Sequence, residues 1–180
     1  MKYKPGPISK SKGFTLVELV VYVGLFAIVL LLMVEFILNI IHSTIRLDAK
    51  EEVHKNAAAI LRSFEYIARD SSAIYTPTSD FVSDPGQLSL VTNVNVLSDE
   101  NEGYADFYVD GGKFCIKQES VGVDCVTSSR VVVTSLRFTK INEGTDIESA
   151  QLRASLRFNS PLSQYYFEET VQTTVRLRAY

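Results

Sequence analysis

The carboxylate in the most unusual surroundings of this 180-residue chain is Glu18, which lies five residues into a long apolar run. A charged side chain at membrane depth costs about 2.5 to 3.5 kcal/mol on insertion scales, so it needs a partner or a function. The run begins abruptly after Lys12 and Gly13, and 16 consecutive uncharged residues follow from Leu19 to Val34. The chemistry indicated here is the pairing of an intramembrane acid with a cation.

A second pair of reactive side chains is formed by the two cysteines, Cys115 and Cys125, which have nine residues between them. The sequence has no CxxC motif, and His42 and His54 lie far from both thiols, so the ligand spacing of a zinc site is absent. Two interpretations stay open. In an extracytoplasmic segment the thiols can form a disulfide that closes a short loop, and otherwise they serve as two small buried hydrophobic residues.

An acidic cluster in "SDENEGYADF" is the remaining candidate for ligand chemistry. Calcium prefers oxygen ligands of this kind, but the spacing does not fit a calcium-binding loop between two helices, so we favour a solvated turn. The sequence also lacks a glycine-rich phosphate loop, HExxH and GxSxG. We therefore predict neither an enzyme nor a bound cofactor or metal. The acidic cluster consists of Asp99, Glu100, Asn101, Glu102 and Asp106.

The charge distribution excludes some partners and predicts a membrane topology. The formal net charge is −3, and no basic cluster lies on an aromatic-rich stretch, so we expect no direct contact with nucleic acid. Residues 1–12 contain four lysines and no acid, whereas "RLDAKEE" follows the apolar region. This asymmetry predicts a single-pass membrane protein with a cytoplasmic N-terminus and an extracytoplasmic head.

The apolar run is long enough to cross a bilayer, because residues 14–34 span about 30 Å as a helix. A secretory signal would be cut after its apolar region at a small-x-small site, and "NIIHSTIRLDAKEE" offers none. A plain signal anchor remains an alternative, although it explains neither Gly13 nor Glu18. Glu35 lies 17 positions after Glu18, about 25 Å along a helix, where its side chain can reach the opposite interface.

The helix is expected to continue far beyond the membrane. Apolar residues recur at three- and four-residue steps up to Ala68, with charged residues between them, and no glycine or proline interrupts residues 25–76. We predict one helix that ends where Pro77 stops it. Residues 14–42 form its membrane part, and residues 43–76 form an amphipathic continuation.

From residue 77 onwards the pattern indicates β-structure. "YADFYVDGGKFCIKQ" places two alternating runs around Gly111 and Gly112, a strong hairpin signal, and the closing strand-length runs are Gln151–Phe158 and Thr170–Arg178. Residues 77–180 are therefore expected to form one antiparallel sheet packed on the long helix, an α+β fold. Tyr165, Tyr166 and Phe167 form an aromatic run that serves either a neighbouring subunit or the core.

The segment "KGFTLVELVV" resembles the cleavage and methylation motif of type IV pilins and type II secretion pseudopilins. Aligned with that motif, Gly13 is the last residue of a leader, residues 1–13, and Phe14 is the first mature residue. Glu18 takes the acidic fifth position. The resemblance implies cleavage and N-methylation of Phe14 by a prepilin peptidase. It also implies a pilin-like fold and three further partners: other pilin or pseudopilin subunits, an inner-membrane assembly platform and the lipid bilayer.

Cleavage after Gly13 would give Glu18 a counter-ion, because it creates an amino group on Phe14. Burying the two charges as a pair recovers much of the cost of burying either alone, so pairing between neighbouring subunits would set their axial register. The subunit's own amine is also within reach before assembly. The alternative is that Glu18 extends to the cytoplasmic headgroups.

The resemblance also bears on the kind of subunit. Glu35 stands where many major pilins carry a proline, and the C-terminal layout with its ending "VQTTVRLRAY" is similar to J-type minor pseudopilins. Glu18 argues against the K-type tip pseudopilin, which usually lacks the acidic fifth residue. We therefore expect a minor pilin or pseudopilin in a type IV pilus-like or type II secretion filament. The alternative is a membrane-tethered extracytoplasmic binding or sensor module.

Overall fold

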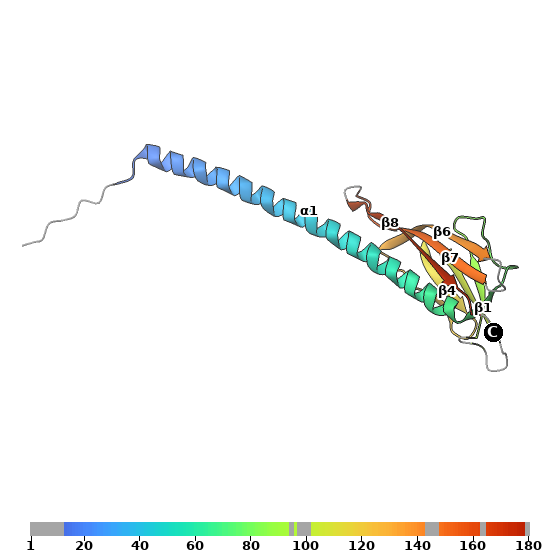
Figure 1. Ribbon diagram of the computed structural model, residues 1–180. Coiled ribbons are helices and arrows are strands. Elements are labelled where there is room, and N and C mark those ends of the chain that lie inside the picture. Colours follow the sequence, from blue (N-terminus) through green and yellow to red (C-terminus); the bar gives the residue numbers. More distant parts are fainter. Residues whose placement is uncertain (1–12, 94–95, 97–101, 143–147, 163–164, 179–180) are drawn as a thin grey trace, which may run out of the picture. The chain divides into compact units, whose positions relative to one another are not determined.

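The computed structural model describes residues 13–93, 96, 102–142, 148–162 and 165–178. The described residues contain one α-helix followed by eight β-strands (Figure 1). The chain divides into two units, Met1–Thr44 and Ile45–Tyr180. In chain order the elements are α1 (Leu16–Arg69), β1 (Ser71–Ile74), β2 (Leu88–Thr92), β3 (Gly103–Asp110), β4 (Lys113–Gln118), β5 (Gly122–Cys125), β6 (Val131–Asn142), β7 (Glu148–Phe158) and β8 (Glu168–Arg176).

The first unit contains the apolar part of α1. Every described side chain from Gly13 to Thr44 is exposed to its surroundings. The most apolar 18-residue window of the helix has a mean hydropathy of 2.8 and none of it is buried within the chain, so α1 is long and apolar enough to cross a membrane. Such a surface is unfavourable in water, and it needs lipid or another apolar surface around it.

In the second unit, α1 buries one face and exposes the other, as the periodicity predicted. The ring of Phe64 lies 5.4 Å from that of Phe107 on β3 and 6.3 Å from that of Phe138 on β6, measured between centroids. The helix therefore packs against both sheets of this unit. Its apolar buried residues recur at helical spacing: Ala49, Val53, Ala57, Ile60, Phe64, Ile67 and Ala68.

The end of the helix differs from the prediction. We expected helix up to residue 76, but α1 ends at Arg69 and β1 follows at once. The Ser71 hydroxyl donates a hydrogen bond of 2.8 Å to the Ile67 carbonyl, which satisfies a helix-end acceptor. Beyond it, the backbone pairs with β2, and Arg178 N donates to the Ser71 carbonyl at 2.9 Å. These partners come from distant parts of the chain, so local pattern could not reveal them.

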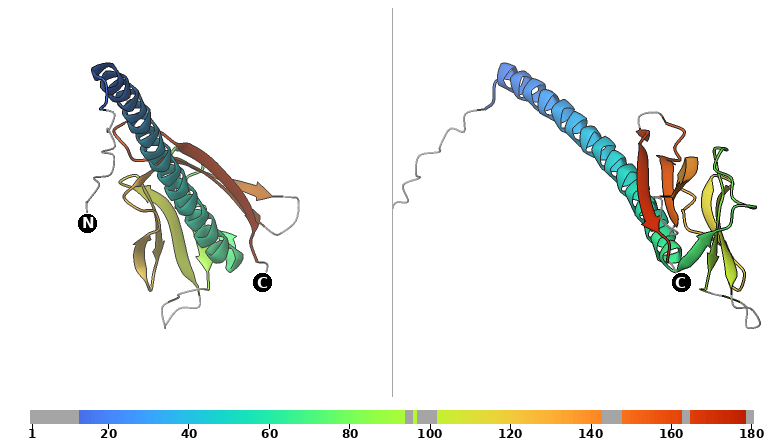
Figure 2. Two further views of the ribbon diagram at one scale, coloured as in Figure 1. Left: turned by 90° about the vertical axis from the view of Figure 1, so that its left-hand side faces the viewer. Right: turned by 45° about the vertical axis from the view of Figure 1, so that its right-hand side comes forward.

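The β-structure forms two antiparallel sheets instead of the single sheet that we expected. One sheet has the strand order β1-β2-β3-β4-β5, and the other has the order β6-β7-β8 (Figure 2). The predicted hairpin is confirmed between β3 and β4, where Asp110 pairs with Lys113. Gly111 and Gly112 form the two-residue turn with φ angles of 54° and 77°, a left-handed conformation that glycine adopts without steric cost.

Glu148, the first residue of β7, connects the two sheets. Its carboxylate accepts hydrogen bonds from Lys140 on β6 and, at 2.9 Å, from the Ile74 amide on β1. Its backbone carbonyl accepts from Leu177 N at 2.9 Å. Partial burial opposes ionisation of this carboxyl, but the Lys140 and Ile74 hydrogen bonds outweigh it and hold the pKa of Glu148 below its ordinary value.

Replacing Glu148 should weaken the second unit and its resistance to acid. Glu148→Gln removes a charge-assisted hydrogen-bond network, so we expect a loss of about 1.5–3 kcal/mol in the free energy of unfolding at pH 7. Because the folded-state pKa of Glu148 is lowered, its contribution is present above its ordinary pKa and is lost as the pH falls through the folded-state pKa. The loss caused by the variant should therefore shrink towards pH 3.

The measurement is urea unfolding of the full chain in detergent, followed by the near-ultraviolet circular dichroism of its tyrosines at pH 3 to 7. Glu51→Gln is the matched control, because Glu51 is exposed and pairs only with Lys55 on the same helix at 2.6 Å. It should change the free energy of unfolding by less than about 0.5 kcal/mol. Equal effects of both variants would contradict the role assigned to Glu148.

Candidate processing and assembly site at the start of the apolar helix

Thr15 and Glu18 form a reciprocal cap at the N-terminus of α1. The Glu18 amide donates to Thr15 Oγ1 at 3.3 Å, and Glu18 Oε2 accepts from the Thr15 amide at 3.0 Å and from the Thr15 hydroxyl at 2.9 Å. This arrangement is a capping box, in which an N-cap threonine and a glutamate three residues later satisfy each other's backbone amides. The Glu18 carboxylate is therefore directed towards the helix N-terminus, where the positive end of the helix dipole favours it.

Thr15 was not among the functional residues predicted from the sequence, although its capping pattern is present there. The pattern Thr-x-x-Glu directly before an apolar run is a marker of a helix start. We considered Glu18 only as a membrane charge in need of a counter-ion. The structure shows that it also has a local partner in the uncleaved chain.

Gly13 and Phe14 precede the helix and are exposed. Phe14 is 76% exposed, and its ring lies 6.0 Å from that of Tyr22 between centroids. The space around Gly13 is open: apart from its two chain neighbours, no described atom lies within 4 Å of the position that a Cβ on Gly13 would take. The peptide bond between Gly13 and Phe14 thus lies outside the helical hydrogen bonding, which begins with the Leu19 amide donating to the Thr15 carbonyl.

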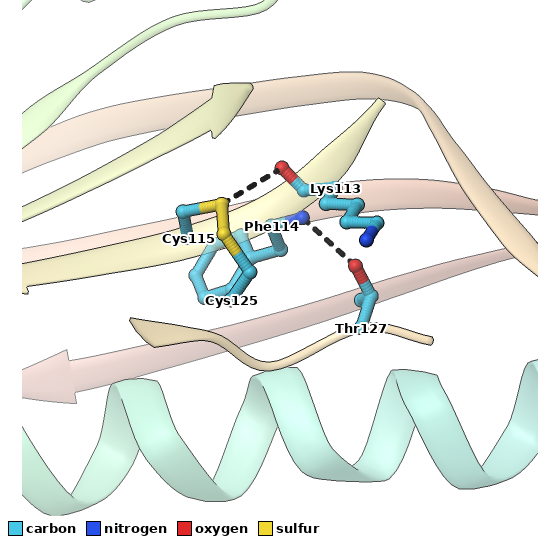
Figure 3. Close-up of a disulfide and its surroundings, with 5 residues drawn as sticks. All are labelled: Lys113, Phe114, Cys115, Cys125 and Thr127. Atoms are coloured by element: carbon cyan, nitrogen blue, oxygen red, sulfur yellow. Dashed lines mark hydrogen bonds between the residues drawn. A yellow bond between two sulfur atoms is a disulfide. The ribbon is translucent and has the colours of Figure 1, made fainter. Parts of the chain in front are cut away.

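Cys115 and Cys125 are joined by a disulfide between β4 and β5 (Figure 3). The two residues are direct cross-strand partners with a Cα–Cα distance of 3.9 Å; Cys115 is buried, whereas Cys125 is exposed. Next to the bridge, Thr127 Oγ1 accepts from the Phe114 amide at 2.9 Å. The bond links the edge strand β5 to the strand beside it.

The other candidate ligands are not brought together by the described residues. Asp99, Glu100 and Asn101 lie outside the described part of the chain, and Asp106 accepts a hydrogen bond of 2.6 Å from Ser89 on the neighbouring strand. In the described ranges, no group of three or more His, Cys, Asp or Glu side chains could hold a metal ion. The expectation of a calcium-free turn stays a prediction.

The comparison with protein families identifies the N-terminal site. A family model described as the prokaryotic N-terminal methylation motif matches residues 8–34. The chain carries the type IV pilin and pseudopilin signature. The match covers Gly13, Phe14, Thr15 and Glu18, but only the first part of the chain. No match was found among curated proteins or among solved structures.

The pilin signature supports a type IV pilin-like or pseudopilin subunit. The family that carries this motif is structural rather than catalytic. It also suggests that the apolar part of α1 anchors the chain in a membrane and that the chain meets a prepilin peptidase and other pilin subunits. The structure adds the local geometry of the motif. Glu18 is a capping residue, and the Gly13–Phe14 bond lies just outside the helix.

Removing the Thr15 hydroxyl should destabilise the first turn of α1. Thr15→Val keeps the shape of the side chain but removes the N-cap acceptor, a loss of about 1 kcal/mol that corresponds to roughly fivefold faster exchange of the Glu18 amide. Hydrogen exchange measured by NMR on the uncleaved chain in micelles tests this. Thr44→Val is the matched control, since Thr44 donates only to the Ile40 carbonyl within the same helix. An unchanged Glu18 amide in Thr15→Val would contradict the cap.

Loss of the disulfide should destabilise the second unit without unfolding α1. The bond closes a loop with a sequence separation of 10, for which chain entropy predicts about 2–3 kcal/mol. The double variant Cys115→Ala, Cys125→Ala should therefore unfold at lower urea concentration than the oxidised protein. Reduction of the native protein should give the same shift. An intact mass equal to that of the dithiol would show that the bond does not form in the cell.

Proposed function

We propose that this protein is a minor pilin or pseudopilin, a structural subunit of a type IV pilus-like or type II secretion filament. The observation that carries the proposal is the methylation motif at residues 8–34, a range that contains Gly13, Phe14 and Glu18. The protein would act by assembly, through its N-terminal helix, and not by catalysis. A minor role is supported by Glu35 in place of the major-pilin proline, and a J-type identity by the C-terminal layout.

Processing is the first step of this function. The basic leader, residues 1–13, would stay in the cytoplasm while the apolar part of α1 spans the inner membrane and the second unit lies outside. A prepilin peptidase would cut between Gly13 and Phe14 and methylate the new amine. Support comes from the exposed backbone at that bond and from the helix start two residues later, at Leu16.

Cleavage changes the partners that are available to Glu18. Before it, the carboxylate accepts hydrogen bonds from the amide and hydroxyl of Thr15. Afterwards, a positive amine on Phe14 lies one residue from Thr15, within reach of the same carboxylate or of a neighbour's Glu18. We infer that in the filament Glu18 pairs with the Phe14 amine of an adjacent subunit, because a paired charge is much less costly in apolar surroundings than a single one.

The apolar surface of α1 would supply the lateral contacts of the filament. Residues 19–34 are all exposed within the described chain, although the ring of Tyr22 lies near that of Phe14, and packing against the helices of other subunits would cover them. An inner-membrane assembly platform would draw the processed subunit from the bilayer into these contacts. The same apolar surface of α1 would thus face lipid in the membrane and other helices in the filament.

Glu18→Ala tests the assembly function, with Glu35→Ala as a matched control in the same apolar helix. Mass spectrometry of the native N-terminus should find a methylated Phe14 in both variants, because both keep the cleavage site. Glu18→Ala should reach the membrane but be depleted at least tenfold from sheared filaments, whereas Glu35→Ala should be incorporated normally.

Two results would contradict the proposal. An intact or differently trimmed N-terminus would show that the motif is not processed. Equal incorporation of both variants, or an absence of the native protein from any filament, would favour a membrane-tethered binding module whose helix is only an anchor. The two results are separable, because the first is read from the mass of the chain and the second from its location.

A further inference from the structure

We propose that a recess in the second unit, between α1 and the segment before β8, binds the anionic headgroups of the membrane that α1 spans. The recess has a volume of about 360 Å³. We refer to it as the headgroup recess. It is lined by Arg46, Leu47 and Lys50 on the helix and by Tyr165, Tyr166 and Phe167 on the segment before β8. The proposal rests on membrane anchoring of α1 and does not require a filament.

The headgroup recess follows the apolar part of α1 directly along the chain. Exposed apolar side chains continue to Ile41, and Arg46 comes five residues later, about 7.5 Å further along a helix. The polar layer on each side of a bilayer is about 5–7 Å thick. Arg46 and Lys50 are the first lysine or arginine residues after the span. Arg46 lies just beyond this layer and Lys50 about 13.5 Å beyond Ile41, and their long side chains can extend back towards the lipid phosphates.

The helix length is compatible with this depth. From Leu19 to Ile41 the helix rises about 33 Å, slightly more than the roughly 30 Å of hydrocarbon, and tilting accommodates such a difference. Glu35 then lies about 9 Å inside the outer boundary, and its side chain would extend towards the headgroup layer. No charged residue follows Glu35 before Arg46.

The side chains of the headgroup recess combine cations with exposed apolar and aromatic groups. Leu47 is 65% exposed, Tyr166 is 57% exposed and Leu162, in the same segment before β8, is 51% exposed. Tyrosines gather at membrane interfaces because one end of the ring system is apolar and the other is polar, and lysine and arginine bind lipid phosphates.

The cations of the headgroup recess are not neutralised by carboxylates. Among the described residues, Arg46 has no ion pair, and the one recorded contact of the Lys50 amine is with the face of the Phe167 ring, 5.9 Å from its centroid. Within the described ranges, Asp48 forms no ion pair with either cation, and three other nearby acids are engaged elsewhere. Glu51 pairs with Lys55 at 2.6 Å, Glu169 lies 2.6 Å from His54 Nδ1, and Glu168 accepts from Tyr166 and Thr134.

The segment that supplies the aromatic rings is held against the helix. Phe167 packs on the hydrophobic core, and its ring lies 5.7 Å from that of His54. Together with the His54–Glu169 contact, this keeps Tyr166 on the helix face that carries Leu47 and Lys50. The geometry of the headgroup recess is therefore fixed before it meets lipid.

The experiment uses the absence of tryptophan from the sequence. Tyr166→Trp introduces a unique fluorophore, and the full chain is reconstituted in vesicles of phosphatidylethanolamine and phosphatidylglycerol that contain lipids brominated near the headgroup. The matched control is Tyr66→Trp. Tyr66 is 65% exposed and lies on α1, 20 residues beyond Arg46 and outside the headgroup recess. We expect bromine to quench the fluorescence of the Tyr166→Trp chain at least twice as strongly as that of the Tyr66→Trp chain. Leu162→Trp is a second probe should the Tyr166 substitution disturb folding.

Charge removal tests which part of the lipid is recognised. The substitutions Arg46→Gln and Lys50→Gln, made together in the Tyr166→Trp chain, should reduce the quenching of its fluorescence at least twofold. Replacing phosphatidylglycerol by phosphatidylcholine in the vesicles should have the same effect. Lys55→Gln with Arg62→Gln, on the same helix outside the headgroup recess, should have no effect. Equal quenching of the Tyr166→Trp and Tyr66→Trp chains would overturn the proposal and assign the recess to a neighbouring subunit. Quenching that is unchanged by charge removal or by neutral lipid would also overturn it.

Discussion

The central constraint on this protein is that the Glu18 carboxylate, which lies in an apolar segment, needs hydrogen-bond or ionic partners. In the uncleaved chain it completes a capping box with Thr15, which satisfies amides that the helix cannot bond internally. A cap of this kind permits a helix to start cleanly in apolar surroundings. The same carboxylate lies close to the bond whose cleavage would produce an amine. One residue can therefore serve helix initiation first and subunit pairing afterwards.

The two units face different physical demands. The first buries nothing within the chain, so its surface is defined by what surrounds it. The second has a core in which Phe64 contacts both sheets, and Glu148 and the Cys115–Cys125 bond add links between strands. In the proposed assembly, the apolar part of α1 would exchange lipid for other helices while the core of the second unit stays packed. The headgroup recess would mark the level to which that helix enters the bilayer.

The sequence predicted those features whose causes are local. Helical periodicity revealed the buried face of α1, and Gly111–Gly112 revealed the β3–β4 hairpin. The end of the helix was misplaced because Ser71 is drawn into a strand by β2 and Arg178, which are distant in sequence. The division into two sheets depends on strand pairing that no pattern encodes. Thr15 was missed for another reason. The Thr-x-x-Glu capping pattern is present in the sequence, but we interpreted Glu18 only as a charge in the membrane.

The central claim is that Glu18 exchanges its local cap for the amine of another subunit. A cryo-electron microscopy structure of the assembled filament, at a resolution that shows side chains, tests it most directly. We expect a Glu18 carboxylate oxygen within about 4 Å of the Phe14 nitrogen of an adjacent subunit, the range of an ion pair. A Glu18 that remains bonded only to Thr15 of its own chain, with the neighbouring amine elsewhere, would contradict the account.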